Sequence, residues 1–391
     1  MTDRTRILLF TGKGGVGKTT CAAATALLAA ERGLRTLVLS SDPAHSLADA
    51  FDRPIGAEPQ ELLPNLFAQE IDLYYSMKKY WSNLREMLLA LFRWQGVDRL
   101  AAEELAALPG MAEGSVLLWL DQAYRSGGYD LIVVDSAPTG ETLTLLTLPQ
   151  VTQWWVSRAF PFQKAAIRTA GFAIRKTTGI PLDRAYNELN ALFDKLKSIQ
   201  AVLADPMISS VRLVMNPERM VIDEGRRAYS YLQLYGYAVD AVVVNRVLPD
   251  EGVGPAFTHY LSAQAGYLEE IEASFQPLPI LRVGHGGAEV FGIDALRRIG
   301  QQLYGERGPA DVFHSAAPYR LSADGTAYCL DVHLPFVEGE ASARQFGDEV
   351  VIQLNNQRRN YALPKFLAYY TLAESRQDDG WFRLRFEPTT N

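Results

Sequence analysis

The stretch that decides the fold is Ile7-Leu8-Leu9-Phe10-Thr11-Gly12-Lys13-Gly14-Gly15-Val16-Gly17-Lys18-Thr19-Thr20, in which a short apolar run leads into a glycine-rich loop. An alanine-rich segment of helical composition, Cys21 to Arg32, follows it. A strand, a glycine-rich loop that ends in Gly-Lys-Thr, and a helix form the context that a phosphate-binding loop requires. The sequence therefore predicts a nucleotide site here, the alternative being a plain glycine-rich turn between a strand and a helix.

The residue types of this loop have physical reasons. Glycines let successive backbone N–H groups curl around an anion, Lys18 brings a positive charge to the β- and γ-phosphates, and Thr19 offers a hydroxyl to Mg²⁺ at the positive end of the helix. A second lysine, Lys13, is not needed for the phosphate cradle of one subunit. Its long side chain suits contact with phosphates held by a facing subunit, the alternative being a solvated loop charge.

Composition excludes several classes of protein. The chain has 391 residues, enough for two or three domains, and 48% of them are hydrophobic. The net charge of −7 argues against a nucleic-acid-binding surface, which is basic. The two cysteines, Cys21 and Cys329, provide neither a disulfide framework nor a paired-thiolate zinc site, and they fit a reducing cytosol. We expect no signal peptide and no transmembrane helix, since the first apolar run is only strand-length.

Two carboxylates follow predicted buried strands. The run Thr36 to Ser40 ends at Ser41-Asp42-Pro43-Ala44-His45-Ser46, and the run Tyr129 to Asp135 ends in a carboxylate. Ligand and catalytic residues of open α/β sheets gather at the carboxyl ends of parallel strands, and Asp135 occupies the position from which an aspartate reaches the water shell of a metal. The alternative for both residues is a turn or a helix cap.

Helical patterns fill the regions on either side of Asp135. We expect helices from Leu62 to Tyr129, divided by Pro109-Gly110, and from Thr142 to Ala204. The aromatic segment Trp154 to Phe162 is crowded enough for a core stripe, but basic residues alternate with apolar positions after it. Core packing and an exposed surface for a client or partner both stay open.

The remaining elements complete an α/β domain. Strands are expected at Arg212–Met215, Ala241–Asn245 and Leu278–Val283, and helices at Asp223–Tyr235 and Gly292–Tyr304. The alternation of strands and helices predicts a doubly wound α/β fold with a mainly parallel sheet over residues 1–304, and with a helical subdomain within about 60–128 and 150–205.

The composition and the hydrophobic pattern of the sequence change after residue 304. Residues 305–318 are rich in small and helix-breaking residues and are expected to form a linker. Residues 319–391 consist of short runs with period two, such as Tyr328–Leu334 and Trp381–Phe386, between turn signals such as Asp324-Gly325. They predict a compact all-β module, which we interpret as a sandwich.

The motifs together resemble the ArsA and GET-pathway targeting ATPases, P-loop proteins with a deviant Walker A motif that carries the extra lysine. The resemblance covers about residues 6 to 304. The matching segments are Gly12 to Thr20, Ser41 to Ser46, Pro109 to Glu113 and Asp135 to Gly140.

The resemblance implies roles for matching positions. ATP is implied to bind the loop residues Gly12, Gly14, Gly15, Val16, Gly17, Lys18, Thr19 and Thr20, with Asn245 reading the base and Pro217 and Glu218 near the nucleotide. Mg²⁺ is implied at Thr19, Asp42 and Asp135. Asp42 would position or activate the attacking water, Lys18 would hold phosphate, and Lys13 would reach the phosphates of the partner subunit.

The chain also departs from the family pattern. Glu141 and Thr144 stand where the family commonly has histidine and arginine, so the coupling of hydrolysis to movement is expected to differ. Arsenite-stimulated members carry a cysteine cluster and two fused halves, whereas this chain has one half and two separated cysteines. It also lacks the Cys-x-x-Cys zinc site through which eukaryotic targeting members dimerise, so a dimer needs another interface.

The C-terminal module resembles an α-crystallin (small heat-shock) domain, on residues such as Tyr328 to Phe336, Gly347 to Val351, Arg358 to Pro364 and Gly380 to Phe386. An unrelated small sandwich is the alternative. Family members with such a module form a branch in photosynthetic bacteria and plastids. The resemblance therefore implies a cytoplasmic protein, or a stromal one in a plastid.

The expected activity is that of a Mg-dependent ATPase acting as a nucleotide-switched homodimer. Three outputs stay open: a targeting factor or chaperone for tail-anchored-like hydrophobic helices, a regulatory partner of a membrane complex, and the motor of an anion or arsenite pump, which the missing cysteine cluster disfavours.

Overall fold

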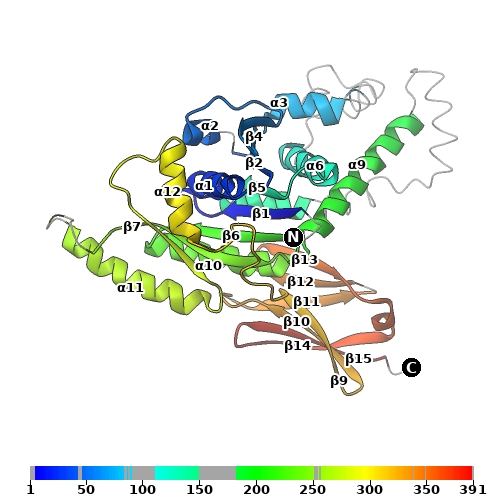
Figure 1. Ribbon diagram of the computed structural model, residues 1–391. Coiled ribbons are helices and arrows are strands. Elements are labelled where there is room, and N and C mark those ends of the chain that lie inside the picture. The colour runs from blue at the N-terminus through cyan, green and yellow to red at the C-terminus, as the bar shows by residue number, and fades with distance from the viewer. Residues whose placement is uncertain are drawn as a thin grey trace.

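The computed structural model describes residues 5–42, 46–82, 86, 89, 111–148, 182–250, 254, 257–337, 339–347 and 349–389. Its N-terminal part is an α/β fold with helices on both faces of one large sheet, and its C-terminal strands form two further sheets beside it (Figure 1). The predicted fold class is confirmed: a doubly wound, mainly parallel sheet followed by an antiparallel all-β region.

The central sheet has eight strands in the order β3-β4-β2-β5-β1-β6-β7-β8. All neighbours run parallel except β3 and β4. The strands are β1 Arg6–Thr11, β2 Thr36–Ser40, β3 Gln60–Leu63, β4 Leu66–Glu70, β5 Leu131–Asp135, β6 Ser209–Met215, β7 Val239–Val247 and β8 Ile280–Gly284. Every residue of β1, β2 and β5 except the terminal positions is apolar and buried, as expected for central strands covered on both faces.

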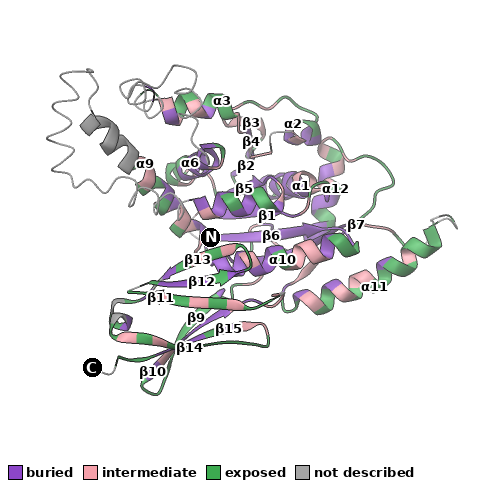
Figure 2. Cartoon of the chain, turned by 180° about the vertical axis from the view of Figure 1, so that it is seen from behind, coloured by how far each residue is buried: buried purple, intermediate pink, exposed green. Residues whose placement is uncertain are grey.

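Helices cover the sheet in two layers. α1 (Lys18–Glu31) and α12 (Ile293–Tyr304) lie on one face and α10 (Arg219–Tyr235) on the other, as the views from both sides show (Figures 1 and 2). The close packing of α12 on α1 accounts for the alanine-rich sequence of α1, because small side chains let the two helices approach. A Cβ atom at Gly300 of α12 would lie 2.9 Å from the Ala24 carbonyl oxygen.

The other described helices lie around these. They are α2 Ser46–Phe51, α3 Leu73–Ser76, the π-helical turn η1 Met77–Trp81, α6 Met111–Ser126, a helix over 139–148, α9 Leu182–Leu203 and α11 Thr258–Phe275. Within the described ranges, no helix is both long and apolar enough to cross a lipid bilayer.

The prediction of helix from Leu62 to Tyr129 is wrong at its beginning, where β3 and β4 extend the sheet. β4 ends in two buried polar residues that break the apolar pattern of a strand. Gln69 donates to the Ala57 carbonyl oxygen (2.8 Å), and Glu70 accepts the backbone N–H of Ala48 (2.8 Å). Pro109-Gly110 and the aromatic segment Trp154–Phe162 lie outside the described residues.

The C-terminal module is a two-layer arrangement of sheets β14-β15-β10-β9 and β11-β12-β13 around its own apolar core. Its strands are β9 Tyr319–Asp324, β10 Ala327–His333, β11 Ala341–Phe346, β12 Glu349–Leu354, β13 Gln357–Ala362, β14 Tyr370–Asp378 and β15 Trp381–Pro388. The module packs on α10. Leu234 of that helix belongs to the core of the module, Tyr361 donates to the Leu234 carbonyl, and the Phe336 N–H donates to Ser230 Oγ (3.2 Å).

Residues 305–318, the expected linker, contact the N-terminal α/β part of the chain at several points. Arg32 donates to the carbonyls of Gly305 and Arg307, and Arg212 donates to the Asp311 carbonyl (3.2 Å). The Phe313 ring stacks on Tyr304, with 6.3 Å between ring centroids. The segment is therefore a strap packed against the α/β fold as well as a connection.

Candidate nucleotide site

The glycine-rich loop leaves the middle of the sheet, because β1 lies between β5 and β6. Two of its glycines leave no room for a side chain. A Cβ atom at Gly12 would lie 2.1 Å from the Val214 carbonyl oxygen. Gly17 has φ 95°, and a Cβ atom there would lie 2.2 Å from Asn245 Nδ2. The loop is thus packed tightly against β6 and β7, and its backbone enters the positive end of α1 at Lys18.

Lys18 lies over this loop and is almost fully buried. Its Nζ atom donates to the Lys13 carbonyl oxygen at 3.4 Å. Burial lowers the pKa of Lys18, and the carboxylates of Asp135, Asp42 and Glu224 oppose that effect. These carboxylates favour the charged form of Lys18, and the ammonium lies beside the loop N–H groups at the N-terminus of α1, where both could bind an anion.

Asp135 closes β5 with no exposed surface. Its Oδ2 atom accepts the Ser40 hydroxyl (3.0 Å), and its Oδ1 atom is buried with no hydrogen-bond partner among the described residues. Burial raises the pKa of Asp135 to about 6, while the nearby hydroxyls of Thr19 and Ser40 and the Lys18 ammonium act to lower it. The ionised form of Asp135 is therefore disfavoured by burial, and a cation bound nearby would stabilise it.

These oxygens fit a small hard cation. The Thr19 and Ser46 hydroxyl oxygens are 3.0 Å apart, and the Thr19 hydroxyl lies near the Asp135 carboxylate, whose Oδ1 has no partner among the described residues. Hydroxyl and carboxylate oxygens are the ligands that Mg²⁺ prefers, and it usually keeps waters and substrate phosphates in its shell. No cluster of three or more His, Cys, Asp or Glu occurs among the described residues, so such an ion would depend on phosphate and water to complete its coordination.

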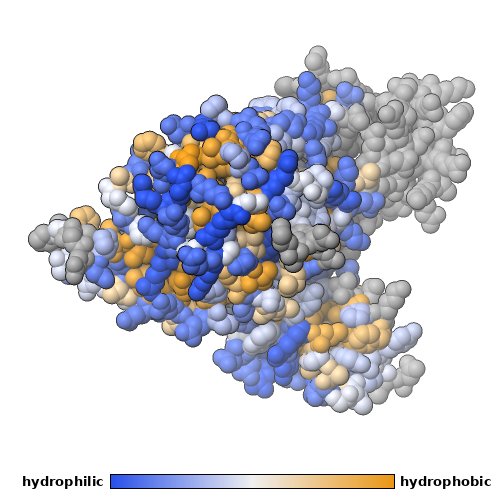
Figure 3. Space-filling view, in the orientation of Figure 1, coloured by the Kyte–Doolittle hydropathy of each residue, from blue (hydrophilic) through white to orange (hydrophobic). Residues whose placement is uncertain are grey.

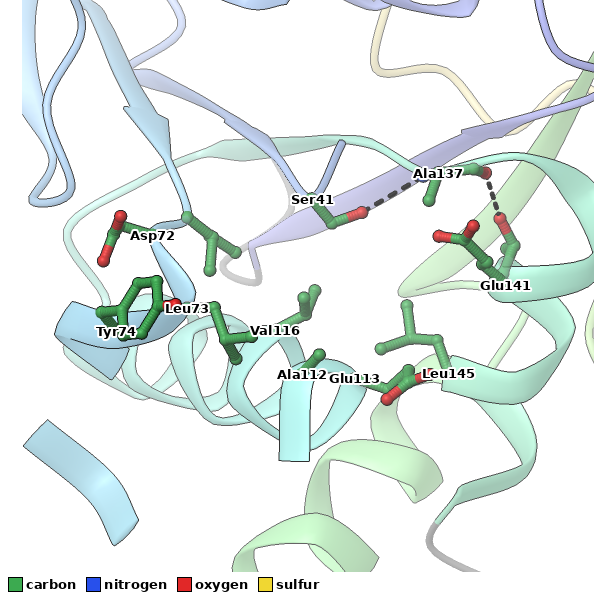
Figure 4. A pocket seen from close by; sticks show the side chains of 12 residues that line it. Ser41, Asp72, Leu73, Tyr74, Ala112, Glu113, Val116, Ala137, Glu141 and Leu145 are labelled. Carbon is green, nitrogen blue, oxygen red and sulfur yellow. Dashed lines mark hydrogen bonds between the residues drawn. The ribbon is translucent and has the colours of Figure 1, made fainter. Parts of the chain in front are cut away.

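The segments that carry Asp42 and Asp135 are bonded to each other. The Ser41 hydroxyl donates to the Asp135 carbonyl (3.3 Å) and accepts the Ala137 N–H (3.2 Å), a contact drawn in Figure 4. The Asp42 N–H donates to Ser40 Oγ (3.2 Å), next to the Asp135 carboxylate. The structure thus brings Asp42, Asp135, Lys18 and the loop close together. Residues 43–45 lie outside the described ranges.

A cavity of about 370 Å³ lies behind these segments (Figure 4). Ser41, Ala137, Glu141 and Leu145 line it from the nucleotide side, and α3 and α6 line it from the other. Most of its wall is apolar. The Thr144 hydroxyl instead donates to the Gly140 carbonyl (3.0 Å) in its own helix, and so takes no part in this wall.

A second cavity, of about 490 Å³, lies on the other side of the loop. Thr20 and Asn245 line it, together with Arg246 and residues 284–290 at the end of β8 and in the loop that follows. Asn245 is held in place because its Nδ2 donates to the Val16 carbonyl (2.8 Å). Asn245, the residue expected to read the base, thus lines this cavity beside the loop.

The sequence alone did not identify three parts of this site, which are Arg246, residues 284–290 and Glu224. The glycine-rich run after a predicted strand was the available signal for 284–290, because ligand sites gather at such ends. Pro217 and the N-cap residue Glu218 directly precede α10, and neither lines the second cavity. The Glu218 carboxylate lies near Tyr260 and acts with burial to raise the pKa of that phenol.

The extra lysine forms a contact within its own chain. Lys13 Nζ is 3.9 Å from Glu224 Oε2 of α10, with 34% and 30% of the two side chains exposed. Glu224 also accepts the Thr139 hydroxyl (3.2 Å). Lys13 is thus held loosely at the surface of the site, within reach of solvent.

Comparison with known proteins agrees with this site. Residues 5–305 match the family described as anion-transporting ATPase, and residues 325–386 match the HSP20-like domain found in ArsA. The chain is 36% identical over 375 residues to putative arsenical pump-driving ATPase 1 of Aquifex aeolicus (strain VF5), covering 93% of this chain and 95% of the relative. Identity is 37% over 388 residues to the putative arsenical pump-driving ATPase of Chlorobaculum tepidum, covering 98% and 96%. It is 28% over 299 residues to ATPase ASNA1 homolog 1 of Paramecium tetraurelia, covering 75% and 90%. With a phosphate loop, two strand-end carboxylates and both family matches in one chain, the protein belongs to the ArsA family of ATPases and carries the HSP20-like domain of that family.

Proposed function

We propose that this ATPase is Mg-dependent and works as a nucleotide-switched homodimer that escorts hydrophobic helices of membrane proteins. The observation that carries the catalytic part is the cluster of Lys18, Asp42 and Asp135 around a loop that admits only glycine at two positions. Family membership supplies the hydrolytic activity, and the cluster supplies groups for phosphate and metal.

Each group has a task that its surroundings suit. Lys18 and the backbone N–H groups of the loop hold phosphate, and Thr19 with Asp135 would hold Mg²⁺, the latter through water. The metal, when bound, supplies charge neutralisation at the phosphate oxygens. Asp42 holds and orients the attacking water, so that catalysis consists of positioning and charge stabilisation.

Lys13 provides the link between two subunits. The Lys13 side chain is about one-third exposed. A phosphate loop needs only the lysine at the position of Lys18 to hold phosphate in its own chain. In a face-to-face dimer Lys13 would contact the γ-phosphate held by the partner, so ATP favours the closed dimer and hydrolysis removes the bridge. A contact that exists in only one of two states is what a nucleotide switch requires.

The proposed escort of hydrophobic helices depends on α3 and α6, which line the first cavity opposite the nucleotide site. α3 presents Tyr74 with 85% exposure and Leu73 with 42%, and both residues also line the cavity that touches Ser41 and Ala137. An exposed apolar surface that adjoins the nucleotide segments is suited to hold a hydrophobic helix in one nucleotide state and release it in another. Figure 3 shows apolar side chains gathered on the β module too, where they would add holding or assembly contacts.

The second candidate is a regulatory or motor subunit of a membrane complex, which the names of the pump-driving relatives favour. Arsenite as the cargo is disfavoured, because Cys21 is buried in α1 and Cys329 is buried in the β module. Two thiols in separate domains cannot ligate one metalloid ion.

One substitution tests both parts. Asp42→Asn is expected to bind ATP as the unchanged protein does and to lose turnover, measured by titration calorimetry and phosphate release. Equal turnover would refute the role of Asp42. The same variant, purified from cells in ATP, is a trap for the output: single-span hydrophobic proteins support escort, a fixed membrane complex supports the second candidate, and an empty trap contradicts both. Lys18→Ala, which cannot hold phosphate, is the matched control.

A further inference from the structure

Glu224 joins two parts of the site that are far apart in the sequence. Its Oε2 atom is 3.9 Å from Lys13 Nζ in the phosphate loop, and its Oε1 atom accepts the Thr139 hydroxyl at 3.2 Å. Thr139 begins the helix that follows the Asp135 segment. One carboxylate of α10 therefore lies against both the phosphate loop and the segment that follows Asp135.

This contact competes with the role proposed for Lys13. A lysine that extends to phosphates of a facing subunit has to turn away from α10 of its own chain. The Glu224 carboxylate also adds to the negative field at Lys18, and so favours cations at the loop. The Lys13 pair is weak, because its atoms are 3.9 Å apart and both side chains are one-third exposed. A weak pair can be exchanged for a contact with a multiply charged phosphate.

We infer that Glu224 is a positioning residue, which holds Lys13 back in the separated protomer and releases it when two ATP-loaded protomers close. This inference rests on the proposed action of Lys13 across a dimer. Thr139 links the release to the nucleotide: a movement of the Asp135 segment that breaks the Thr139 hydrogen bond also loosens the Glu224 side chain. The carboxylate thus opposes premature closure and sets the protein concentration at which ATP drives dimer formation.

Glu224→Gln tests this directly, because the amide keeps the size of the side chain and an acceptor for Thr139 but loses the charge. The measurement is sedimentation velocity over a range of protein concentrations in ATP and Mg²⁺, in the Asp42→Asn background so that ATP persists. We expect the midpoint concentration for dimer formation to fall by about two- to five-fold for each of the two symmetric sites.

Asp223→Asn is the matched control, since its carboxylate lies next in sequence on α10 and pairs with Arg226 (3.5 Å) instead. Its midpoint should equal that of the parent protein. The far-UV circular dichroism spectrum, which a folding defect would change, should be the same in all three proteins.

The double variant with Lys13→Ala separates this inference from the function on which it rests. We expect Lys13→Ala to weaken dimer formation and to abolish the effect of Glu224→Gln. If Lys13→Ala weakens dimer formation but Glu224→Gln leaves the midpoint concentration unchanged or raises it, only the role of Glu224 is refuted. If Lys13→Ala has no effect on dimer formation, the proposed action across the dimer fails, and the role of Glu224 fails with it.

Discussion

Asp135→Asn should make the nucleotide-free protein more stable while it disables the site. The Asp135 carboxylate is fully buried, and burial raises its pKa from the ordinary 3.8 to about 6. The folded state therefore binds a proton more tightly than the unfolded chain between these two values. Stability from this group is greatest below pH 3.8, falls as the pH rises toward 6, and stays reduced above that pH.

The magnitude follows from the shift in pKa. A difference of about two units, at about 1.4 kcal/mol per unit, amounts to roughly 3 kcal/mol of destabilisation at neutral pH. The asparagine keeps an acceptor for the Ser40 hydroxyl, but its new N–H donors have to find partners at a position where Oδ1 has none. We therefore expect a net gain of about 1–3 kcal/mol, seen as a rise of roughly 2–6 °C in melting temperature.

The assay is thermal melting of both proteins in EDTA without nucleotide, from pH 5 to pH 8. The variant should melt at a higher temperature at pH 8, and the gap should narrow toward pH 5. Asp240→Asn is the control, because Asp240 is equally buried but pairs with Arg6 and Arg212 (3.2 Å each), and its loss should lower the melting temperature. A variant at Asp135 no more stable than the parent at pH 8, or a gap that widens in acid, would refute the reasoning.

Gly17→Ala should lower both the melting temperature and the affinity for ATP, because φ is 95° and the new methyl group would meet Asn245 at 2.2 Å; Gly14→Ala, where a Cβ atom has nothing within 4 Å, should keep the melting temperature. A melting temperature for Gly17→Ala equal to that for Gly14→Ala would contradict this. Tyr361→Phe removes the donor to the Leu234 carbonyl and should destabilise the docked β module by about 1–2 kcal/mol in urea unfolding followed by tryptophan fluorescence; an unchanged unfolding curve would show that the bond contributes little.

Parts of the site could be predicted because their signals are local. The phosphate loop needs a short apolar strand, closely spaced glycines and a helix, and all three occur within residues 7–32. β2 and β5 are buried on both faces, so that their runs are continuously apolar, and each ends at a functional segment. The places of Asp42 and Asp135 followed from those two strands alone.

The elements that were missed lack such signals. β4 ends in Gln69 and Glu70, which are buried but polar, and resembles part of a helix when read without its partners. β14 is an edge strand whose second half, Glu374 to Asp378, is polar and exposed. The contact of Lys13 with Glu224 joins residues more than two hundred positions apart, a pairing that only the arrangement of α10 over the sheet creates.

The central claim is that each catalytic site is completed by Lys13 of a second chain, and mixing two inactive variants tests it most directly. Lys13→Ala and Lys18→Ala proteins, each inactive alone, are mixed in equal amounts in ATP and Mg²⁺, and phosphate release is measured. In a mixed dimer, one site combines an intact Lys18 with an intact Lys13 from the other chain. Random pairing would make half of the dimers mixed, each with one such site, so a quarter of the parent activity is the upper limit for the mixture. Weaker closure of the mixed dimer lowers the recovered activity below that limit, but it should stay clearly above the activity of either variant alone. A mixture no more active than its two components would contradict the account.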